Sequence, residues 1–84
     1  MAYQVLLRSS AEKEMDALPG PFHKKIALKI LALAETPRPP GCKKLSGTNG
    51  YRIRIGNYRV VYTVDDKAAV VTVVGVGHRR EIYR

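Results

Sequence analysis

The first half of the chain combines one strand-like run with two segments that carry hydrophobic residues at helical spacing. Residues 3–8 are a short, mostly apolar run, which predicts a strand. In residues 9–18 and 22–33 the apolar positions recur every three or four residues, as on one face of a helix. The side chains expected to face the core are Ala11, Met15, Leu18, Phe22, Ile26, Ile30 and Leu33.

Local signals set the ends of the two predicted helices. Ser9 and Glu12 have the spacing of a capping box, which places the start of the first helix at this serine. The Pro-Gly-Pro sequence at 19–21 stops that helix, and the second helix is expected to begin directly after it. Pro37 ends the second helix, because the residue before a proline is pushed out of the helical conformation. Residues 38–41 then form an extended loop.

The second half of the chain predicts three strands joined by tight turns. Residues 51–55 and 58–64 flank a Gly-Asn turn and alternate between apolar and other side chains for much of their length. Residues 65–67 form another turn, and residues 68–76 are a nearly unbroken apolar run, as expected of a central strand covered on both faces. The order β–α–α–β–β–β belongs to the α+β class, with a helical hairpin packed on a mainly antiparallel sheet.

Length and composition narrow the class of protein further. We expect one domain spanning residues 1–84, and a hydrophobic fraction of 45% is too high for a disordered tail. We expect neither a membrane span nor a signal peptide, since no apolar run is long enough and no basic segment leads one. Cys42 is the single cysteine and makes no zinc pattern with His23 and His78. A reduced, cytoplasmic protein without metal or cofactor is therefore expected.

Positive charge is concentrated in the second half of the chain. Fifteen Lys and Arg residues against seven Asp and Glu residues give a net charge of +8. Residues 1–42 hold six basic and four acidic side chains, whereas residues 43–84 hold nine and three. This asymmetry predicts a surface that faces a polyanion, with nucleic acid as the first candidate.

The segment 51–62 predicts three arginines on one face of a hairpin. A two-residue loop at 56–57 places Arg54 directly opposite Arg59. Since side chains alternate along a strand, Arg52 shares their face, and the apolar side chains go to the other face and the helices. Like charges directly opposite cost a few tenths to about 1 kcal/mol. A guanidinium matches phosphate through its bidentate fork, so we infer a phosphodiester backbone as the ligand.

Two other interpretations remain open, one for the hairpin arginines and one for the acidic residues of the turn at 65–67. The arginines would be structural if Asp65, Asp66 or Glu81 neutralised them. The adjacent carboxylates Asp65 and Asp66 are only weak evidence for a metal site, because two ligands in a turn fall short of the number a cation needs.

The C-terminal residues supply candidates for acid–base chemistry. RNA cleavage requires a base for the 2′-hydroxyl, cations for the phosphorane and an acid for the 5′-oxygen. Arginine can supply only charge, whereas a tyrosine among arginines can have its pKa lowered enough to act as a base. Without such a role, Tyr83 would anchor the C-terminal segment on the sheet and His78 would be a surface residue. The candidates for proton transfer or charge stabilisation are His78, Arg79, Glu81 and Tyr83.

Residues 51–62, with 76–79 and the pair 82–83, resemble the RelE toxins of bacterial type II toxin–antitoxin modules. The resemblance covers nearly the whole chain, and within the RelE/ParE superfamily it favours the RelE branch. It implies a small RNase-like fold and an mRNA endoribonuclease that acts in the ribosomal A site, with ribosome and mRNA as partners. It also implies inhibition by a RelB-like antitoxin, and contact with operator DNA only through the antitoxin complex. Complementarity to the positive charge predicts that this antitoxin is acidic. Since no apolar run is long enough to span a membrane, no membrane partner is expected.

The same resemblance implies roles for individual residues. Arg52 and Arg54 match a basic pair that contacts the phosphates, and Arg59 matches an arginine that stabilises the transition state. Arg79 matches an arginine at the leaving side, and Tyr83 matches the tyrosine proposed as general base.

The chain departs from the RelE pattern in one respect, because that pattern has lysines where this chain has Arg52 and Arg54. A lysine can exchange a proton and an arginine cannot, so these two positions are expected to supply charge and not proton transfer. His78 is a second candidate for the acid–base work. The further basic residues assigned to RNA binding are Lys43, Lys44 and Arg80.

Two other functions fit the sequence. A toxin of the ParE branch would inhibit DNA gyrase, with the hairpin serving protein contact and Tyr83 dispensable. An inactive toxin would survive as a corepressor with its antitoxin. Cleavage of ribosome-bound mRNA distinguishes the leading interpretation from both.

Overall fold

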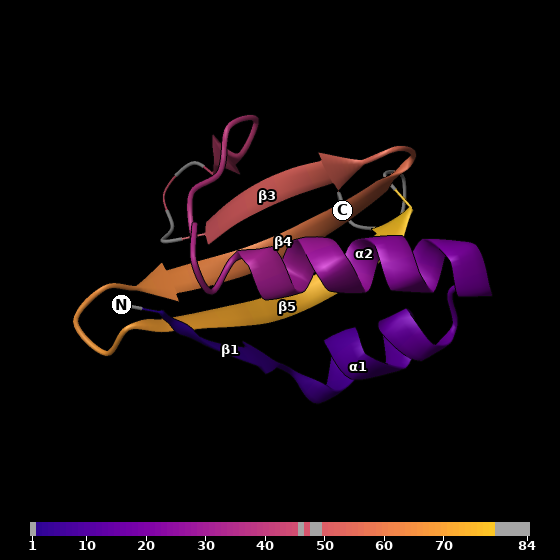
Figure 1. Cartoon of the computed structure of the whole chain (residues 1–84), viewed down its shortest axis with the longest axis horizontal. Helices are drawn as coiled ribbons and strands as arrows, with labels where there is room; N and C mark the ends of the chain where they lie inside the picture. Colours follow the sequence, from indigo (N-terminus) through magenta and orange to yellow (C-terminus); the bar gives the residue numbers. More distant parts are fainter. Residues whose placement is uncertain (1, 46, 48–49, 79–84) are drawn as a thin grey trace.

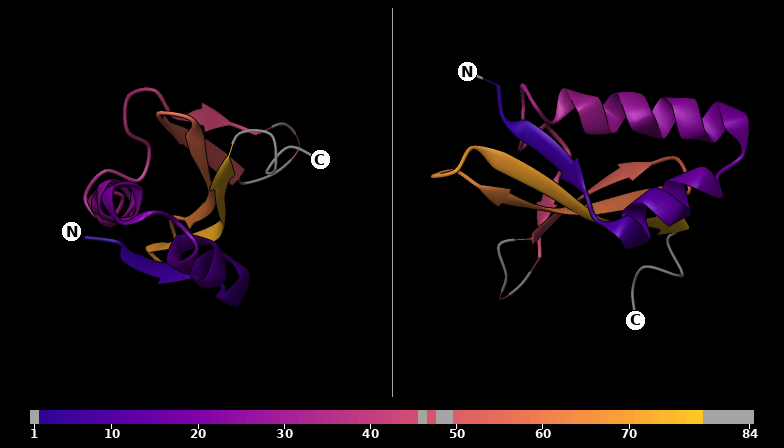
Figure 2. Two further views of the ribbon diagram at one scale, coloured as in Figure 1. Left: turned by 90° about the vertical axis from the view of Figure 1, so that its right-hand side faces the viewer. Right: turned by 90° about the horizontal axis from the view of Figure 1, so that it is seen from below.

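Two helices lie on one face of a twisted five-stranded sheet (Figures 1 and 2). The computed structural model describes residues 2–45, 47 and 50–78. The α+β fold predicted from the sequence is confirmed, with one additional short strand. The elements are β1 (Gln4–Leu7), α1 (Ser9–Asp16), α2 (Gly20–Ala32), β2 (Lys43–Lys44), β3 (Gly50–Ile55), β4 (Tyr58–Asp65) and β5 (Val70–His78).

The strand order in the sheet is β1-β5-β4-β3-β2. β1 pairs with β5 in parallel, and the other neighbours are antiparallel. A parallel pair needs a long crossover, and the two helices form the first part of this connection. β2 was not predicted, because two residues are too few to show a periodic pattern.

The predicted capping box at the start of α1 is wrong. Ser9 is the first helical residue, and the cap position falls on Arg8, which has extended backbone angles and no side-chain cap. The Arg8 amide donates to Val73 O (3.0 Å), while the Glu12 amide donates to Arg8 O (2.9 Å). β1 therefore runs straight into the helix, and main-chain bonds take the place of the serine side chain.

α2 begins two residues earlier than predicted, at Gly20. Pro21 lies in its first turn, where a backbone N–H would have no partner within the helix and the fixed φ of proline is favourable. The proline that was expected to separate the helices thus belongs to the second one, and Pro19 occupies its cap position.

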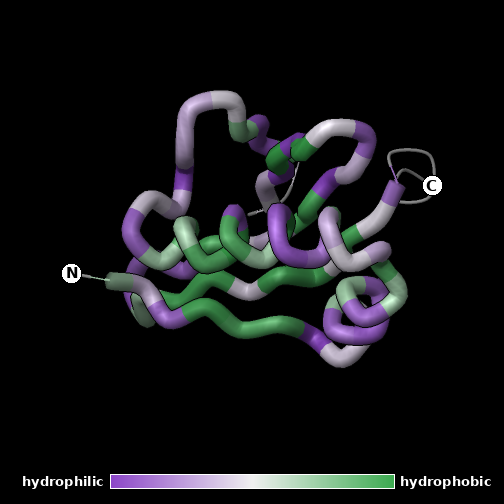
Figure 3. The backbone as a smooth tube through the Cα atoms, turned by 45° about the vertical axis from the view of Figure 1, so that its right-hand side comes forward, coloured by the Kyte–Doolittle hydropathy of each residue, from purple (hydrophilic) through white to green (hydrophobic). Residues whose placement is uncertain are grey.

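The core lies between the helices and the sheet, where hydrophobic residues follow the strands and alternate with hydrophilic ones along the helices (Figure 3). The predicted inward positions of α1 and α2 are buried except for Leu18, which is half-buried, and Phe22, which is 43% exposed. The Phe22 ring nevertheless lies 5.1 Å from that of Tyr58. The sheet contributes Ile53, Ile55, Val60, Tyr62, Val64, Val71, Val73 and Val76.

Within the described residues, helices cover only one face of β5, contrary to the prediction of two covered faces. Val71 and Val73 are fully buried, whereas Thr72 and Val74 are half-buried. The strand also begins at Val70 and not at residue 68, because the preceding residues belong to the turn.

A β-bulge interrupts the pairing of β4 with β5. Tyr62 lies opposite Val73, but the preceding residue Val61 lies opposite Gly75, so one residue of β5 is extra. Beside the bulge the Val76 amide donates to Glu14 Oε1 of α1 (2.8 Å). A carboxylate thus satisfies a main-chain donor here and ties α1 to the sheet.

The hydroxyl of Tyr62 joins the sheet to the loop after α2. The side chain is fully buried, and its hydroxyl donates to Pro37 O at 2.8 Å. Burial raises the pKa of the Tyr62 hydroxyl, and the neighbouring Cys42 thiol adds to the shift.

We expect Tyr62→Phe to lower the free energy of unfolding by about 1 kcal/mol, because it removes this hydrogen bond. Because the pKa of Tyr62 is raised in the folded protein, its protonated hydroxyl contributes fully to the free energy of unfolding below about pH 10, the ordinary tyrosine value. This contribution is lost as the pH rises further. Urea unfolding between neutral pH and pH 11 measures both effects. Tyr58→Phe is the control and should keep the alkaline loss of stability; a Tyr62→Phe protein as alkali-sensitive as wild type would contradict the assignment.

Candidate nucleic-acid interface

The β3–β4 hairpin has the register predicted from the sequence. Gly56 has φ +61°, which fits the first position of a type II′ turn, and Ile55 lies opposite Tyr58. Arg54 is therefore paired with Arg59, and this prediction is confirmed.

Four cations line one hollow of about 210 Å³, which we call the cation pocket. β2 contributes to it because Lys43 pairs directly with Arg52 of β3. Among the described residues, the lining contains no acidic side chain. The residues of the cation pocket are Gly41, Lys43, Arg52, Arg54 and Arg59.

Exposure differs strongly among the pocket arginines. Arg59 is only 6% exposed, Arg52 is half-buried and Arg54 is exposed. Electrostatic interactions strengthen as water is excluded, so Arg59 is the cation best placed to act strongly on a bound anion. The exposed Arg54 is better suited to an approaching phosphate.

The bulge in β5 places two glycines on the same face of the sheet as these arginines. Beyond it, Gly75 lies opposite Val61 and Gly77 lies opposite Arg59. Two residues without side chains therefore face the same side of the sheet as the arginines, whereas uninterrupted pairing would have put Val74 and Val76 there.

Both acids of the β4–β5 turn are engaged at the other end of the sheet. Arg38 Nη2 donates to Asp66 Oδ2 at 2.8 Å, and the Tyr3 hydroxyl donates to Asp66 Oδ1 at 2.6 Å. Asp65 Oδ1 accepts from the Ala68 amide at 3.1 Å. Their predicted alternative role as partners of the hairpin arginines is not supported, and Glu81 lies outside the described residues.

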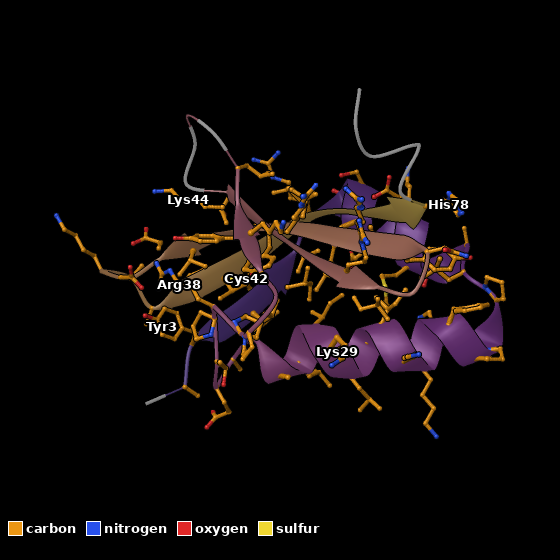
Figure 4. The ribbon with its side chains drawn as sticks, turned by 90° about the horizontal axis from the view of Figure 1, so that it is seen from above. Tyr3, Lys29, Arg38, Cys42, Lys44 and His78 are labelled. Carbon is orange, nitrogen blue, oxygen red and sulfur yellow. The ribbon has the colours of Figure 1, made fainter. Side chains whose placement is uncertain are left out.

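The Arg38–Asp66 pair also fixes the loop that leads to β2 (Figure 4). Arg38 Nε donates to the Tyr51 hydroxyl at 2.9 Å, so one guanidinium joins this loop to β3 and to the β4–β5 turn. Arg38 lowers the pKa of the Asp66 carboxyl, and Asp66 in turn raises that of the Tyr3 hydroxyl. No local pattern in the sequence predicts this cluster, because its members are far apart in the chain.

Lys44, predicted to bind RNA, does not lie in the cation pocket. It pairs with Tyr51, so strand alternation turns it away from Lys43 and the arginines. It lines a separate hollow of about 700 Å³ that also contains Arg38 and Asp66. Figure 4 shows it at this end of the sheet.

His78 is also placed away from the cation pocket. Its register partner is Tyr58, and the two rings lie 5.9 Å apart edge to face. Cross-strand partners share a face, so His78 faces the helix side while its neighbour Gly77 faces the arginines. The bulge produces this placement, since it shifts the register by one residue.

The other predicted site residues, Arg79, Arg80 and Tyr83, lie outside the described residues. Within residues 2–45, 47 and 50–78, no three His, Cys, Asp or Glu side chains are close enough together to hold a metal ion. No helix in the described part of the chain is long and apolar enough to cross a membrane.

Sequence and structure comparisons relate this chain to known toxins. Residues 5–83 match the family described as ParE toxin of type II toxin-antitoxin system, parDE. The mRNA interferase toxin RelE of Escherichia coli K12 is 32% identical over 87 residues, covering 99% of this chain and 92% of that protein. Toxin RelG of Mycobacterium tuberculosis is 30% identical, covering 100% and 99%. The archaeal RelE–RelB complex from Pyrococcus horikoshii matches with a TM-score of 0.84 and 29% identity, covering 94% of this chain and 97% of that one.

Proposed function

The chain belongs to the RelE/ParE superfamily of type II toxin–antitoxin toxins, and from this membership we propose that it is an mRNA endoribonuclease acting in the ribosomal A site. The K12 relative bears the name mRNA interferase, which supports an RNA-cleaving activity for this chain too. The reaction needs no metal in this proposal.

The observation that carries the proposal is the cation pocket. A hollow lined by three arginines and a lysine suits the phosphodiester group, whose charge increases when the phosphorane forms. Lys43, Arg52 and Arg54 would hold the phosphates on either side of the scissile bond. Arg59 would stabilise the extra negative charge of the transition state, because it is the most buried of the four.

Proton transfer is assigned to residues beyond β5. Tyr83 would take the proton of the 2′-hydroxyl, since arginine charges can lower the pKa of a tyrosine enough for it to act as a base. Arg79 and Arg80 would contribute positive charge, the first at the leaving side. His78 becomes the weaker acid–base candidate, since its ring packs against Tyr58 on the opposite face of the sheet.

An acidic antitoxin is the proposed regulatory partner. The Pyrococcus relative was solved as a complex with RelB, and the net charge of +8 favours a segment rich in Asp and Glu. Such a segment would neutralise the cation pocket and exclude mRNA. Operator DNA would be reached only through this complex.

Cleavage of ribosome-bound mRNA tests the proposal directly. Purified protein should cut mRNA in programmed ribosomes within the A-site codon, in the presence of EDTA at a concentration that leaves ribosomes intact, and should leave the same mRNA uncut without ribosomes. Expression alone should stop growth, and coexpression with the adjacent open reading frame should restore it. Intact mRNA on ribosomes would contradict the proposal.

Gyrase inhibition is the second candidate, because the matching family is described as ParE toxin. In that case the arginine hairpin would contact protein. A supercoiling assay with DNA gyrase separates the two: inhibition without mRNA cleavage would favour gyrase as the target.

A further inference from the structure

A second hollow adjoins the cation pocket, and we call it the proline groove. It has a volume of about 410 Å³, within the range of roughly 300–1,000 Å³ typical of small-ligand sites. Its walls come from the end of α2, the loop after it and β3. Its lining residues include Lys29, Leu33, Thr36, Pro39, Pro40 and Ile53.

The proline groove exists because β2 covers only part of the β3 edge. Lys43 and Lys44 pair with Arg52 and Tyr51, and the chain before them leaves the sheet. Two prolines and Gly41, which has φ +92°, keep that stretch from continuing the ladder. The edge of β3 at residues 53–55 therefore faces the loop and α2 across a gap.

The two hollows share two residues, Gly41 and Arg54. Arg54 is exposed and lines both hollows, so a phosphate bound to it in the cation pocket would lie beside the proline groove. In a nucleotide the ribose carries the phosphate on one side and the base on the other. A strand with its phosphate in the cation pocket could thus place its base in the neighbouring hollow.

The lining of the proline groove suits a base more than a second phosphate. Buried Leu33, Ile53 and Ile55 offer apolar contact to the faces of a flat ring. Lys29 and Thr36 add polar groups among these apolar walls. The lysine ammonium can only donate hydrogen bonds, so it favours an edge that presents acceptors.

We propose that the proline groove is a nucleobase subsite that prefers keto bases, with Lys29 donating to the base carbonyl. Guanine presents O6 and N7 acceptors and uracil presents O4, whereas adenine and cytosine present an amino donor at the corresponding position. The inference rests on the proposed function, because the phosphate of the same RNA strand occupies the cation pocket. The residue that would set the base preference, Lys29, therefore lies on α2 and not on the arginine hairpin.

Titration of the full-length protein with five phosphate compounds tests the subsite. GMP and AMP form one pair of equal ring size, UMP and CMP form another, and ribose 5-phosphate lacks a base. Followed by NMR, GMP should bind about five- to tenfold more tightly than AMP, and UMP more tightly than CMP. The Thr36 amide should shift with the nucleotides and not with ribose 5-phosphate.

Two lysine variants provide the matched comparison. Lys29→Ala should remove the preference for keto bases and leave ribose 5-phosphate binding unchanged. Lys24→Ala makes the same charge change at an exposed position of α2 outside the groove lining, and should keep the preference. Equal binding of all five compounds to the wild type would overturn the subsite.

A third variant separates failure of the subsite from failure of the cation pocket. Lys43→Ala should weaken the binding of all five compounds alike, because Lys43 lines the cation pocket and is absent from the lining of the proline groove. If it does so while base preference is absent, the phosphate site stands and the subsite is wrong. If Lys29→Ala leaves nucleotide binding unchanged and weakens binding of the antitoxin, the groove is a protein interface, which also overturns the inference.

Discussion

Replacing Arg59 with Met should lower single-turnover cleavage of ribosome-bound mRNA by roughly 10²–10³-fold, the loss typical of removing one donor that stabilises a transition-state anion. Arg59 is 6% exposed, so its guanidinium acts where water screens charge least. Methionine keeps an unbranched apolar stem in the buried site. The variant therefore tests the charge with little change in packing.

Thermal melting of the same variant is the control for folding. Relief of the repulsion between Arg54 and Arg59 should offset part of any lost contact, so the protein should melt close to the wild type. Arg59→Lys keeps the charge but not the bidentate fork and should lose activity to a smaller extent. A folded Arg59→Met protein with full activity would remove Arg59 from the mechanism, and one that melts far below the wild type would make it structural.

Tyr83→Phe should lower the rate of single-turnover cleavage by roughly 10²–10⁴-fold, while the affinity for mRNA stays nearly unchanged. Phenylalanine keeps the ring and removes only the hydroxyl that would accept the 2′-proton. Rapid-quench kinetics with saturating ribosomes measures the chemical step, and mRNA binding is followed separately.

His78→Ala is the matched comparison for Tyr83→Phe, because both residues were candidates for acid–base work. The structure places His78 beside Tyr58 on the helix side of the sheet, so its loss should leave the cleavage rate close to the wild-type value. The assignment fails if His78→Ala loses as much as Tyr83→Phe, since the base would then be the histidine.

The arginine hairpin could be predicted from sequence because everything that sets it is local. Gly56 and Asn57 form the turn, and the period of two in the flanking strands assigns each side chain to a face. The helices were predicted for the same reason, although main-chain bonds replaced the serine cap and a proline was accepted in the first turn of α2.

The faces on which His78 and Lys44 lie depend on pairings that no local pattern reveals. If β4 and β5 paired without a bulge, starting from the turn between them, His78 would lie on the arginine face. The single extra residue of β5 moves it to the helix face. Lys43 and Lys44 look equivalent in the sequence, but pairing with β3 turns their side chains to opposite faces of the sheet, so that Lys43 lines the cation pocket and Lys44 lines a different hollow.

The sequence by itself determined the order of the main elements, the register of the arginine hairpin, the family and the positive charge. Each of these depends on residues close together in the chain or on composition alone. Only the tertiary structure decided the burial of Arg59, the pairing of Lys43 with Arg52, the Arg38–Asp66 ion pair and the proline groove. These features depend on contacts between distant segments, which are fixed when the helices and the whole sheet pack and not by the preference of any one segment.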